Sequence, residues 1–328
     1  MTEQTAQNTM RAVVATAAGP ADVLQIRQVA KPEPGPTEIL VRVHAAAINP
    51  ADWKTRAAGG WTGRRGAEDP ERGVILGWDV SGVVEAVGRG VTLFQPGDEV
   101  FGMPLFPHFP GAYSEYVVAP ARHFAAKPSG LTHVEAAALP LASLTAHQAL
   151  ADFAKVQPGQ RVLVHAAAGG VGHLAVQIAK ALGAHVIGTA SAAKHDFVRG
   201  LGADEVIDYR AVDFADAVAE VDVVIDAVGG DYYDRSLRTL KPGGTLVALC
   251  YDVDAEMRPR ADERGVAADF MLVEPDHAGL LAIRELVEQG RLRPVVDTVL
   301  PLADAAKAHE LGEAGRTAGK IVLSVVED

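Results

Sequence analysis

The sequence predicts an α/β protein, in which a doubly wound parallel sheet is joined to a second domain rich in β-strands. Three observations predict this class. The chain has 328 residues, of which 48% are hydrophobic, so it is long enough for two domains that each bury a core. Its first third contains short apolar stretches separated by Pro and Gly, as in β-rich domains. From Arg161 onward, apolar strands alternate with amphipathic helices.

The first third of the chain contains the candidate strands of the β-rich domain. The clearest is Ile39–Ala45, in which apolar residues alternate with polar Arg42 and His44. The other candidates are Arg11–Thr16, Val23–Val29, Val80–Val87, Asp98–Phe101 and Tyr113–Val118. Ala57–Gly73 and Met103–Gly111 lack this periodicity, and we expect them to be loops that border a ligand pocket.

The remainder of the chain begins with helices and then alternates strand and helix. The expected strands are Val162–Ala166, His185–Thr189, Glu205–Ile207, Val221–Ala227 and Thr245–Cys250. The expected helices are Val134–Ala138, Ser143–Lys155, Val171–Leu182, Ala192–Leu201, Phe214–Val218, Tyr232–Leu240, Ala278–Gln289 and Ala303–Glu313. Alternation of this kind is typical of βαβ units in a parallel sheet. We expect the last strand, Lys320–Val325, to return to the N-terminal domain.

Composition limits the partners and the location of the protein. A net charge of −12 disfavours nucleic acid, whose phosphates are bound by clustered Lys and Arg. The single cysteine, Cys250, cannot form an intramolecular disulfide, so we expect a cytoplasmic protein. Residues 1–9 are polar and are expected to form a disordered tail instead of a signal peptide. The longest uncharged run, Val162–Ala179, is interrupted by glycines and polar residues, and we expect no membrane partner.

A glycine-rich turn follows the first strand of the predicted parallel sheet. Ala167, Gly169 and Gly172 have the spacing A-x-G-x-x-G directly before a helix. Gly169 would let the backbone approach a pyrophosphate, and Gly172 would let helix and strand pack closely. A turn that serves only helix packing is the alternative, but the strand before it and the helix after it favour a dinucleotide site. The predicted contacts are Ala168, Gly169, Gly170 and Val171.

The end of the next strand predicts which dinucleotide is bound. An NAD site needs a carboxylate about 20 residues after the glycine turn, whereas this strand ends in Thr189 and Ser191, followed by Lys194. Hydroxyl and ammonium donors suit a 2′-phosphate, so we predict NADPH as cofactor, bound by Ser191 and Lys194. Tyr209 and Arg210 would add contacts to the same phosphate. An ordinary solvated lysine at a helix start is the alternative for Lys194.

Motifs spread over the chain from Met10 onward carry a resemblance to a known family. They are Ala47–Asp52, Gly77–Gly82, Pro96–Val100, Gly111–Tyr116, Leu144–Ala146, the glycine turn and Gly319–Leu323. Together they resemble the medium-chain dehydrogenase/reductase superfamily, and within it the zinc-independent NADPH:quinone oxidoreductase branch. The resemblance implies a GroES-like catalytic domain made of residues 10–126 and 273–328. It also implies a Rossmann NADP-binding domain at residues 127–272, a cofactor cleft at their junction, and a homodimer.

The sequence departs from the zinc-dependent alcohol dehydrogenases that it resembles more distantly. Asn49 stands where those enzymes carry their first zinc-ligand cysteine, and Trp78 and Asp79 stand where they carry His-Glu. A catalytic zinc needs three ligands of Cys, His or carboxylate type, and a single cysteine also leaves no cluster for a structural zinc. We therefore expect no metal.

Without zinc, the substrate must contain an electrophile that is already activated. Conjugated carbonyl compounds meet this condition, because hydride can add to a quinone or to the β-carbon of an enone while charge develops on the carbonyl oxygen. By resemblance, that carbonyl lies near Asn49, Asp52 and Lys54. We expect Asn49 to position the nicotinamide ribose or to donate to the developing enolate. The alternatives are an Asn that caps the turn before Pro50, and a local ion pair between Asp52 and Lys54.

The proton donor is left open by the sequence. Enoyl-thioester reductases of the superfamily carry a tyrosine where Gly60 and Trp61 fall here, and an indole N–H does not release a proton. We expect Trp61 to stack on a flat substrate ring. Tyr113 and Tyr116 are other candidates, although packing is the simpler explanation for them. Bulk water is the remaining source of the proton.

Further cofactor contacts follow from the fold and the resemblance, because ligands lie at the carboxyl ends of parallel strands. They are Thr145, Val228, Leu249, Cys250, Tyr251, Phe270, Met271, Leu272 and Lys320. We expect Cys250 itself to be a buried, inert thiol. The predicted function is NADPH-dependent reduction of a small, flat, apolar quinone or enone. The alternatives are an enoyl reductase of a biosynthetic pathway and a non-catalytic NADPH-binding protein.

Overall fold

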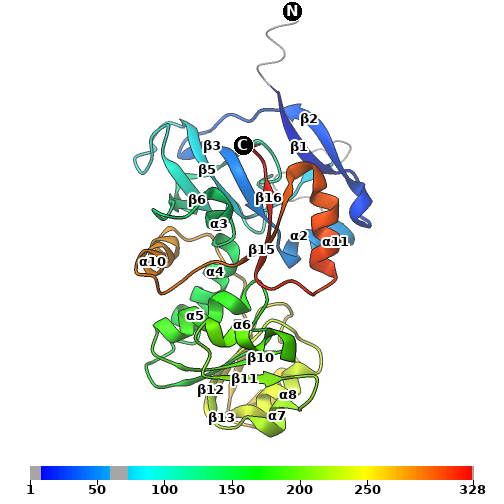
Figure 1. Ribbon diagram of the computed structural model, residues 1–328, viewed down its shortest axis with the longest axis vertical. Coiled ribbons are helices and arrows are strands. Elements are labelled where there is room, and N and C mark those ends of the chain that lie inside the picture. The colour runs from blue at the N-terminus through cyan, green and yellow to red at the C-terminus, as the bar shows by residue number, and fades with distance from the viewer. Residues whose placement is uncertain (1–8, 60–72, 327–328) are drawn as a thin grey trace, which may run out of the picture. The chain divides into compact units, whose positions relative to one another are not determined.

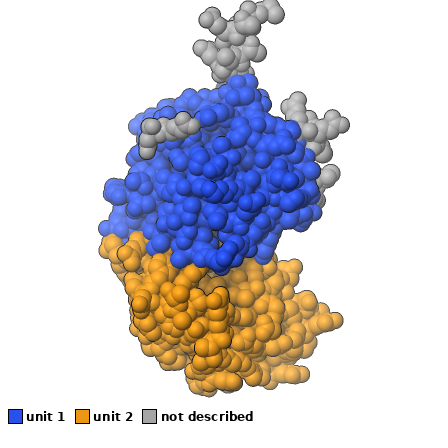
Figure 2. Space-filling model, turned by 45° about the vertical axis from the view of Figure 1, so that its right-hand side comes forward, with its two compact units in different colours: residues 1–141, 274–288, 294–328 blue, residues 142–273, 289–293 orange. Residues whose placement is uncertain are grey.

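The computed structural model describes residues 9–59 and 73–326 (Figure 1). Two compact units make up the chain (Figure 2). The first unit contains residues 1–141, 274–288 and 294–328, and the second contains residues 142–273 and 289–293. The chain therefore leaves the first unit and returns to it. Of the tail predicted at residues 1–9, only Thr9 lies within the described residues, where it begins strand β1.

The second unit is built on a parallel sheet. Its strands within the described residues have the order β11-β10-β9-β12-β13-β14, and every neighbouring pair is parallel. Their bounds are β9 Arg161–Val164, β10 His185–Ala190, β11 Glu205–Asp208, β12 Val221–Asp226, β13 Leu240–Ala248 and β14 Ala267–Phe270. Numbered along the chain, this order is 3-2-1-4-5-6, which is that of a doubly wound nucleotide-binding sheet. The predicted Rossmann-type fold is confirmed.

Helices cover both faces of this sheet, because each crossover between parallel strands needs a connecting element. Figure 1 shows α5 and α6 on one face and α7 and α8 on the other. Their bounds are α5 Gly172–Ala181, α6 His195–Gly200, α7 Phe214–Ala217 and α8 Tyr232–Thr239, and α9 Arg258–Asp262 follows farther along the chain. Before them, α4 Pro140–His147 continues as a π-helical stretch, Gln148–Phe153. Phe214, Tyr233 and Leu237 pack with strand residues in one buried apolar cluster.

The first unit contains two sheets within the described residues. The larger has the order β15-β16-β3-β5-β6-β8, with β7 also paired to β3, and the smaller has the order β2-β1-β4. Their bounds are β1 Thr9–Ala15, β2 Leu24–Ala30, β3 Glu38–Ala47, β4 Val74–Ile75, β5 Val80–Val87, β6 Glu99–Gly102, β7 Tyr116–Pro120, β8 Phe124–Ala126, β15 Val296–Pro301 and β16 Lys320–Ser324. Because β16 pairs antiparallel with β3, the last strand lies beside an N-terminal strand.

The helices of the first unit include one that the sequence pattern does not predict. Their bounds are α2 Pro50–Ala58, α3 His133–Ala137, α10 His277–Glu288 and α11 Ala305–Glu313. Helix α2 begins at Pro50, whose fixed φ suits the first helical position, with Asn49 at the N-cap. The strands β4, β8, β14 and β15 are also missing from the prediction. Such strands form because neighbouring strands pair with them, and their local sequence alone does not indicate them. None of the helices in the described residues is long and apolar enough to cross a membrane.

Candidate functional site

Three polar side chains meet in the interior of the first unit. Asn49 follows β3, Asp79 precedes β5 and Lys320 opens β16, and these strands are neighbours in one sheet. The Lys320 ammonium lies 3.0 Å from Asp79 Oδ2 and also donates to Asn49 Oδ1. Asn49 Nδ2 donates to Asp79 Oδ2 over 2.8 Å. All three side chains are at most 3% exposed, and we call them the charged trio.

The charged trio fixes the orientation of the Asn49 amide. Lysine only donates hydrogen bonds, so Oδ1 of Asn49 must face Lys320 and the NH₂ group must face Asp79. The second oxygen of Asp79, Oδ1, accepts the main-chain N–H of Leu141 over 2.6 Å. A buried ion pair is tolerated only when such additional hydrogen bonds satisfy its groups. One N–H of the Asn49 side-chain amide therefore donates to Asp79, and because the amide group is planar, the direction of its second N–H is also fixed.

Asp52 lies on α2 and contacts main-chain groups instead of Lys54. It is fully buried; its Oδ2 accepts the N–H of Asn49 over 2.6 Å and its Oδ1 accepts the N–H of Gly77 over 3.1 Å. Burial raises the pKa of Asp52 to about 7, against the lowering effect of the hydrogen bonds from Asn49 and Tyr113. Lys54 is exposed and does not contact Asp52, because residues two apart on a helix do not face each other. The alternative of an Asp52–Lys54 ion pair is wrong.

The residues at this place do not fit a zinc ion. Within the described residues, no group of three His, Cys, Asp or Glu side chains is arranged to hold a metal. Asp79 already holds an ammonium, and Trp78 is buried with its Nε1 donating to the carbonyl of His108 over 2.6 Å. An amide, a lysine and an indole are not the donor set that zinc requires. Trp61, which we predicted to stack on the substrate, lies outside the described residues.

The glycine turn of the second unit joins β9 to α5 where the strand order reverses. β9 lies between β10 and β12, and ligands of doubly wound sheets bind at this switch point. A Cβ on Gly172 would overlap the carbonyl oxygen of Ala166 and lie 2.8 Å from the Cα of Ala167, so close packing requires glycine there, as predicted. Ala166 itself has a φ of 49°. The main chain of residues 168–171 precedes α5, and N–H groups at such a helix start suit a pyrophosphate.

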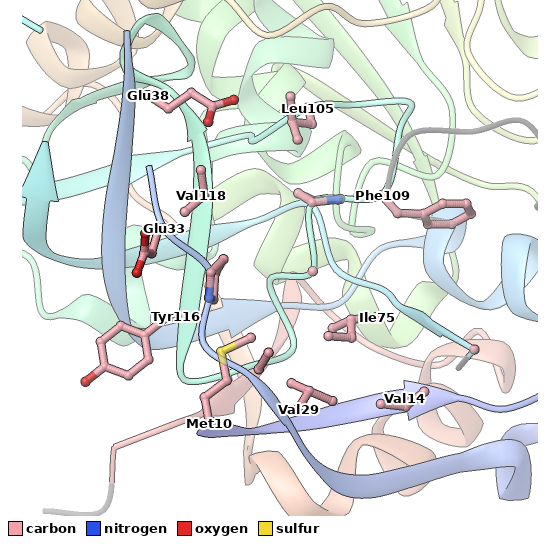
Figure 3. Close-up of a pocket in the computed structure, with 15 residues that line it drawn as sticks. Met10, Val14, Val29, Glu33, Glu38, Ile75, Leu105, Phe109, Tyr116 and Val118 are labelled. Atoms are coloured by element: carbon pink, nitrogen blue, oxygen red, sulfur yellow. The ribbon is translucent and has the colours of Figure 1, made fainter. Parts of the chain in front are cut away.

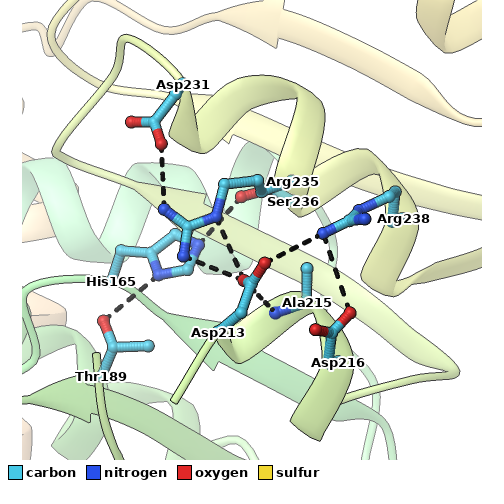
Figure 4. Close-up of polar contacts among 9 residues, drawn as sticks. All are labelled: His165, Thr189, Asp213, Ala215, Asp216, Asp231, Arg235, Ser236 and Arg238. Carbon is cyan, nitrogen blue, oxygen red and sulfur yellow. Dashed lines mark hydrogen bonds and ion pairs between the residues drawn. The ribbon is translucent and has the colours of Figure 1, made fainter. Parts of the chain in front are cut away.

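Neutral side chains support this turn from the interior of the second unit (Figure 4). His165 Nε2 lies 2.9 Å from Ser236 Oγ, and His165 Nδ1 lies 3.2 Å from Thr189 Oγ1. The same Thr189 hydroxyl accepts the main-chain N–H of Ala166 over 3.2 Å. Burial lowers the pKa of His165 to about 4, so its ring is neutral at pH 7. We call His165, Thr189 and Ser236 the neutral cluster; it holds Ala166, the residue directly before the glycine turn.

The residues predicted to bind the 2′-phosphate follow β10 and β11, which are neighbours in the sheet. Ser191 is the N-cap of a short 3₁₀ turn and Lys194 is its last residue; both are partly exposed. Tyr209 is 39% exposed, and the Arg210 guanidinium lies 5.6 Å from the centroid of its ring. The structure also shows a carboxylate here: Asp208 ends β11, and its Oδ1 accepts the N–H of Arg210 over 3.0 Å.

The other predicted cofactor contacts of the second unit follow neighbouring parallel strands. Val228 follows β12, Leu249, Cys250 and Tyr251 follow β13, and Phe270, Met271 and Leu272 lie at the end of β14 or directly after it. Because the carboxyl ends of parallel strands meet at one edge, the structure brings these residues to the same edge as the glycine turn. Thr145 lies on α4 and is buried. Cys250 is partly exposed, so the prediction that it is buried is wrong.

Asp226, which sequence reasoning missed, organises the segment after β12. Its Oδ1 accepts the N–H groups of Val228 over 2.8 Å and Gly229 over 3.0 Å. Its Oδ2 accepts the hydroxyl of Tyr251 over 2.7 Å. The signal was present in the sequence, because a carboxylate that ends a mostly apolar strand needs several donors once it is buried. Asp226 therefore sets the backbone that carries Val228.

The Met103–Gly111 loop borders a pocket in the first unit (Figure 3). The pocket has a volume of about 510 Å³. Leu105 and Phe109 line it from the loop, while Met10 and Val29 line it from β1 and β2. Tyr116, one of the candidate proton donors, lines this pocket, but Asn49, Asp79 and Lys320 do not, so the pocket is separate from the charged trio.

Two family models match the chain. One is described as an alcohol dehydrogenase GroES-like domain and matches residues 35–129, and the other is described as a zinc-binding dehydrogenase and matches residues 201–323. They match segments of the first unit and a stretch that includes most of the parallel sheet.

Relatives and solved structures match over nearly the full length. NAD(P)H oxidoreductase RTN4IP1, mitochondrial, of Mus musculus is 35% identical over 89% of this chain and 82% of its own. The 2-methylene-furan-3-one reductase of Solanum lycopersicum is 34% identical over 96% of this chain and 79% of its own. The quinone oxidoreductase from Coxiella burnetii superposes with a TM-score of 0.89 at 38% identity, over 97% of this chain and 100% of that one. The chain therefore belongs to the medium-chain dehydrogenase/reductase superfamily, in its NADPH:quinone oxidoreductase branch.

Proposed function

We propose that the protein is a zinc-independent, NADPH-dependent reductase that transfers hydride to a quinone or to the C=C bond of an α,β-unsaturated carbonyl compound. The glycine turn at the reversal point of a 3-2-1-4-5-6 parallel sheet carries this proposal, because that place in the fold binds dinucleotides. The names of the relatives support an oxidoreductase that uses a nicotinamide cofactor. The donor set at the charged trio supports a reaction without zinc.

Asn49 supplies the polar group that this reaction needs. The bound cofactor provides the hydride, and negative charge then develops on the carbonyl oxygen of the substrate. We assign the second N–H of the Asn49 amide to that oxygen, because the first donates to Asp79 and the carbonyl of the amide faces Lys320. Lys320 and Asp79 keep the amide from flipping. A donor that is held in advance stabilises developing charge without the cost of reorganisation.

The test of this function is NADPH oxidation by the purified protein with a panel of quinones, enones and acyl thioesters. We expect turnover of quinones or enones, no loss of activity with a chelator, and no stoichiometric zinc in the protein. Turnover of acyl thioesters alone would identify an enoyl reductase. NADPH binding without turnover of any compound would identify a non-catalytic binding protein, and zinc-dependent activity would contradict the proposal.

Replacement of Asn49 by Ala tests the assigned donor. We expect Asn49→Ala to lower kcat by about 100-fold, as for loss of one oxyanion donor, with little change in the KM for NADPH. Gln25→Ala, which removes an exposed amide on β2, is the control and is expected to keep full activity. Full turnover by Asn49→Ala, with an unchanged thermal transition, would eliminate this role.

The preference for NADPH is tested at Lys194. We expect Lys194→Ala to raise the Kd for NADPH about tenfold or more, as for loss of a charged hydrogen bond, and to leave NADH binding nearly unchanged. Lys307→Ala, an exposed lysine on α11, is the control. Equal effects of Lys194→Ala on both cofactors would remove the assignment of a 2′-phosphate contact.

Two further predictions accompany the proposed function. We propose a homodimer, which sedimentation equilibrium of the purified protein would check by its mass. We also propose a cytoplasmic location, supported by the use of a single cysteine, which forms no intramolecular disulfide. Fractionation of the source cells with an antibody against the protein would check it.

A further inference from the structure

Arg56 joins helices α2 and α11 inside the first unit. Its side chain is 2% exposed, and all three guanidinium nitrogens donate. Nε donates to the carbonyl of Gly19 over 2.9 Å, and one terminal nitrogen donates to Glu313 Oε1 over 2.6 Å. The other terminal nitrogen lies 3.1 Å from Nδ1 of His309. A buried guanidinium with this many partners is held in one orientation.

Arg56 decides the tautomer of His309. Guanidinium groups only donate, so Nδ1 of His309 must accept and carries no proton. Burial and the neighbouring Arg56 lower the pKa of His309 to about 3, so the ring is neutral at pH 7. The proton of the neutral ring therefore sits on Nε2, which lies 3.3 Å from the hydroxyl oxygen of Tyr113. His309 donates to that oxygen, and Tyr113 is left to donate its own proton elsewhere.

Asp52 is the acceptor towards which the Tyr113 hydroxyl donates. Both side chains are fully buried and both contact Gly77: its N–H donates to Asp52 Oδ1, and the Tyr113 ring packs against it. The Tyr113 hydroxyl acts on Asp52 as a hydrogen-bond donor that lowers the pKa of this carboxyl group. Burial, and then the charge of Asp52, raises the pKa of Tyr113, so the phenol keeps its proton. The Tyr113 ring is also fixed from behind, because a Cβ on Gly77 would come within 2.7 Å of its Cε1 atom. The donors run in one direction, from Arg56 through His309 and Tyr113 to Asp52.

We propose that Tyr113 is a positioning residue for the reaction: held by His309 and Arg56, its hydroxyl keeps Asp52 as a carboxylate aimed at the main chain of Asn49, and so sets the Asn49 amide. This inference rests on the proposed function, since the amide of Asn49 is the group assigned to the substrate. It separates Tyr113 from the proton donors considered for the reaction, because the single hydroxyl proton of Tyr113 already bonds to Asp52. It also gives a role to α11, whose His309 and Glu313 lie far from Asn49 in sequence.

The pH dependence of the reaction follows from the groups around Asp52. Asp79 acts to raise its pKa, and Lys320 and Tyr113 act to lower it. Arg56 and His309 face it from beyond Tyr113. Since the pKa of Asp52 lies at about 7, the carboxylate is lost as the pH falls through neutrality. Removal of the Tyr113 hydroxyl would move this transition to higher pH, because a hydrogen bond that favours the charged form is gone.

The experiment compares wild type with Tyr113→Phe over a range of pH. We expect the acidic limb of kcat to move up by about one pH unit in Tyr113→Phe, which lowers kcat about fivefold at pH 7. At pH 9 we expect kcat to return to near the wild-type value. The KM for NADPH is expected to be unchanged, and Asp52→Asn is expected to abolish the acidic limb. Tyr232→Phe, a partly exposed phenol in the second unit, is the matched control.

A measurement without turnover keeps this inference separate from the proposed function. The backbone amide resonance of Asn49 reports on its hydrogen bond to Asp52. We expect it to titrate near pH 7 in wild type and about one unit higher in Tyr113→Phe, even if no substrate is ever turned over. The same midpoint in both proteins, or a kcat that falls equally at every pH, would overturn the role of Tyr113. Titration as expected in a protein that reduces nothing would refute the proposed function alone.

Discussion

The charged trio of the first unit and the neutral cluster of the second are both buried and both well hydrogen-bonded, but they differ in charge. Asn49, Asp79 and Lys320 hold an ion pair, whereas the side chains of the neutral cluster carry no charge at pH 7. A buried charge is compensated only when every partner is present, while a buried neutral group needs only its hydrogen bonds. The difference teaches that the first unit buries charged groups, which costs free energy unless they stay paired. The second unit holds a backbone turn with neutral groups, whose burial costs less free energy.

The largest effect on stability is expected from a substitution that breaks the ion pair. Lys320→Met leaves the Asp79 carboxylate buried without its cation, and we expect the free energy of unfolding to fall by about 3–5 kcal/mol. Urea unfolding followed by circular dichroism measures this. The double variant Lys320→Met/Asp79→Asn removes both charges and is expected to recover part of the loss. Lys307→Met, at an exposed position on α11, is expected to change stability little, and an equal loss in both lysine variants would contradict the comparison.

The next largest effect is the pH dependence of stability, which tests whether the His165 ring of the neutral cluster must stay neutral. The pKa of His165 is lowered from 6.5 to about 4, so the unfolded chain binds a proton between these pH values that the folded protein does not. The stability that His165 contributes is therefore complete above pH 6.5 and is lost as the pH falls towards 4, by up to about 3 kcal/mol.

We expect His165→Gln to show a shallower loss of stability between pH 6.5 and 4 than wild type, measured by urea unfolding at each pH. Asp52 and His309 titrate in both proteins, so the difference between the two curves isolates His165. His108→Gln, which changes an exposed histidine, is the control and is expected to follow the wild-type curve. Parallel curves for wild type and His165→Gln would show that the cluster does not depend on a neutral ring.

The smallest effect concerns the turn that the neutral cluster supports. Gly172→Ala forces a Cβ against Ala166 and Ala167, and we expect it to lower the free energy of unfolding by about 1–3 kcal/mol. Gly200→Ala is the matched control: it lies in helix α6, where an added Cβ meets nothing within 4 Å, and alanine there is expected to raise stability by up to about 1 kcal/mol. Thermal unfolding of both variants measures the difference. An equal change in stability in the two variants would contradict the close packing of Gly172 against Ala166 and Ala167.

Much of the second unit could be predicted from its sequence. Its strands and helices follow from regular alternation of apolar segments, and the place of the glycine turn follows from the spacing of Gly169 and Gly172. The first unit was less predictable, because β4 and β15 owe their pairing to strands far away in sequence. Helix α2 was missed for a related reason: its nine residues mix small apolar residues with polar ones and carry little periodicity.

The candidate site divides in the same way. Asn49 and Lys320 were identified as site residues through the resemblance of their motifs, but nothing in the sequence joins them to each other through Asp79. Arg56, His309 and Glu313 gave no signal at all, since a single arginine, histidine or glutamate in a helix is most often exposed. Only burial in the folded chain makes their pairing obligatory.

The sequence by itself determined the class of the protein, the parallel sheet and the turn that suits a dinucleotide, because these depend on local periodicity and on glycine at positions where a side chain does not fit. The tertiary structure alone decided which way the Asn49 amide points, which tautomer His309 adopts and which carboxylates are buried. These depend on the directions of donors and acceptors between residues as far apart as 49 and 320, and hydrogen-bond direction is set only when the chain has folded.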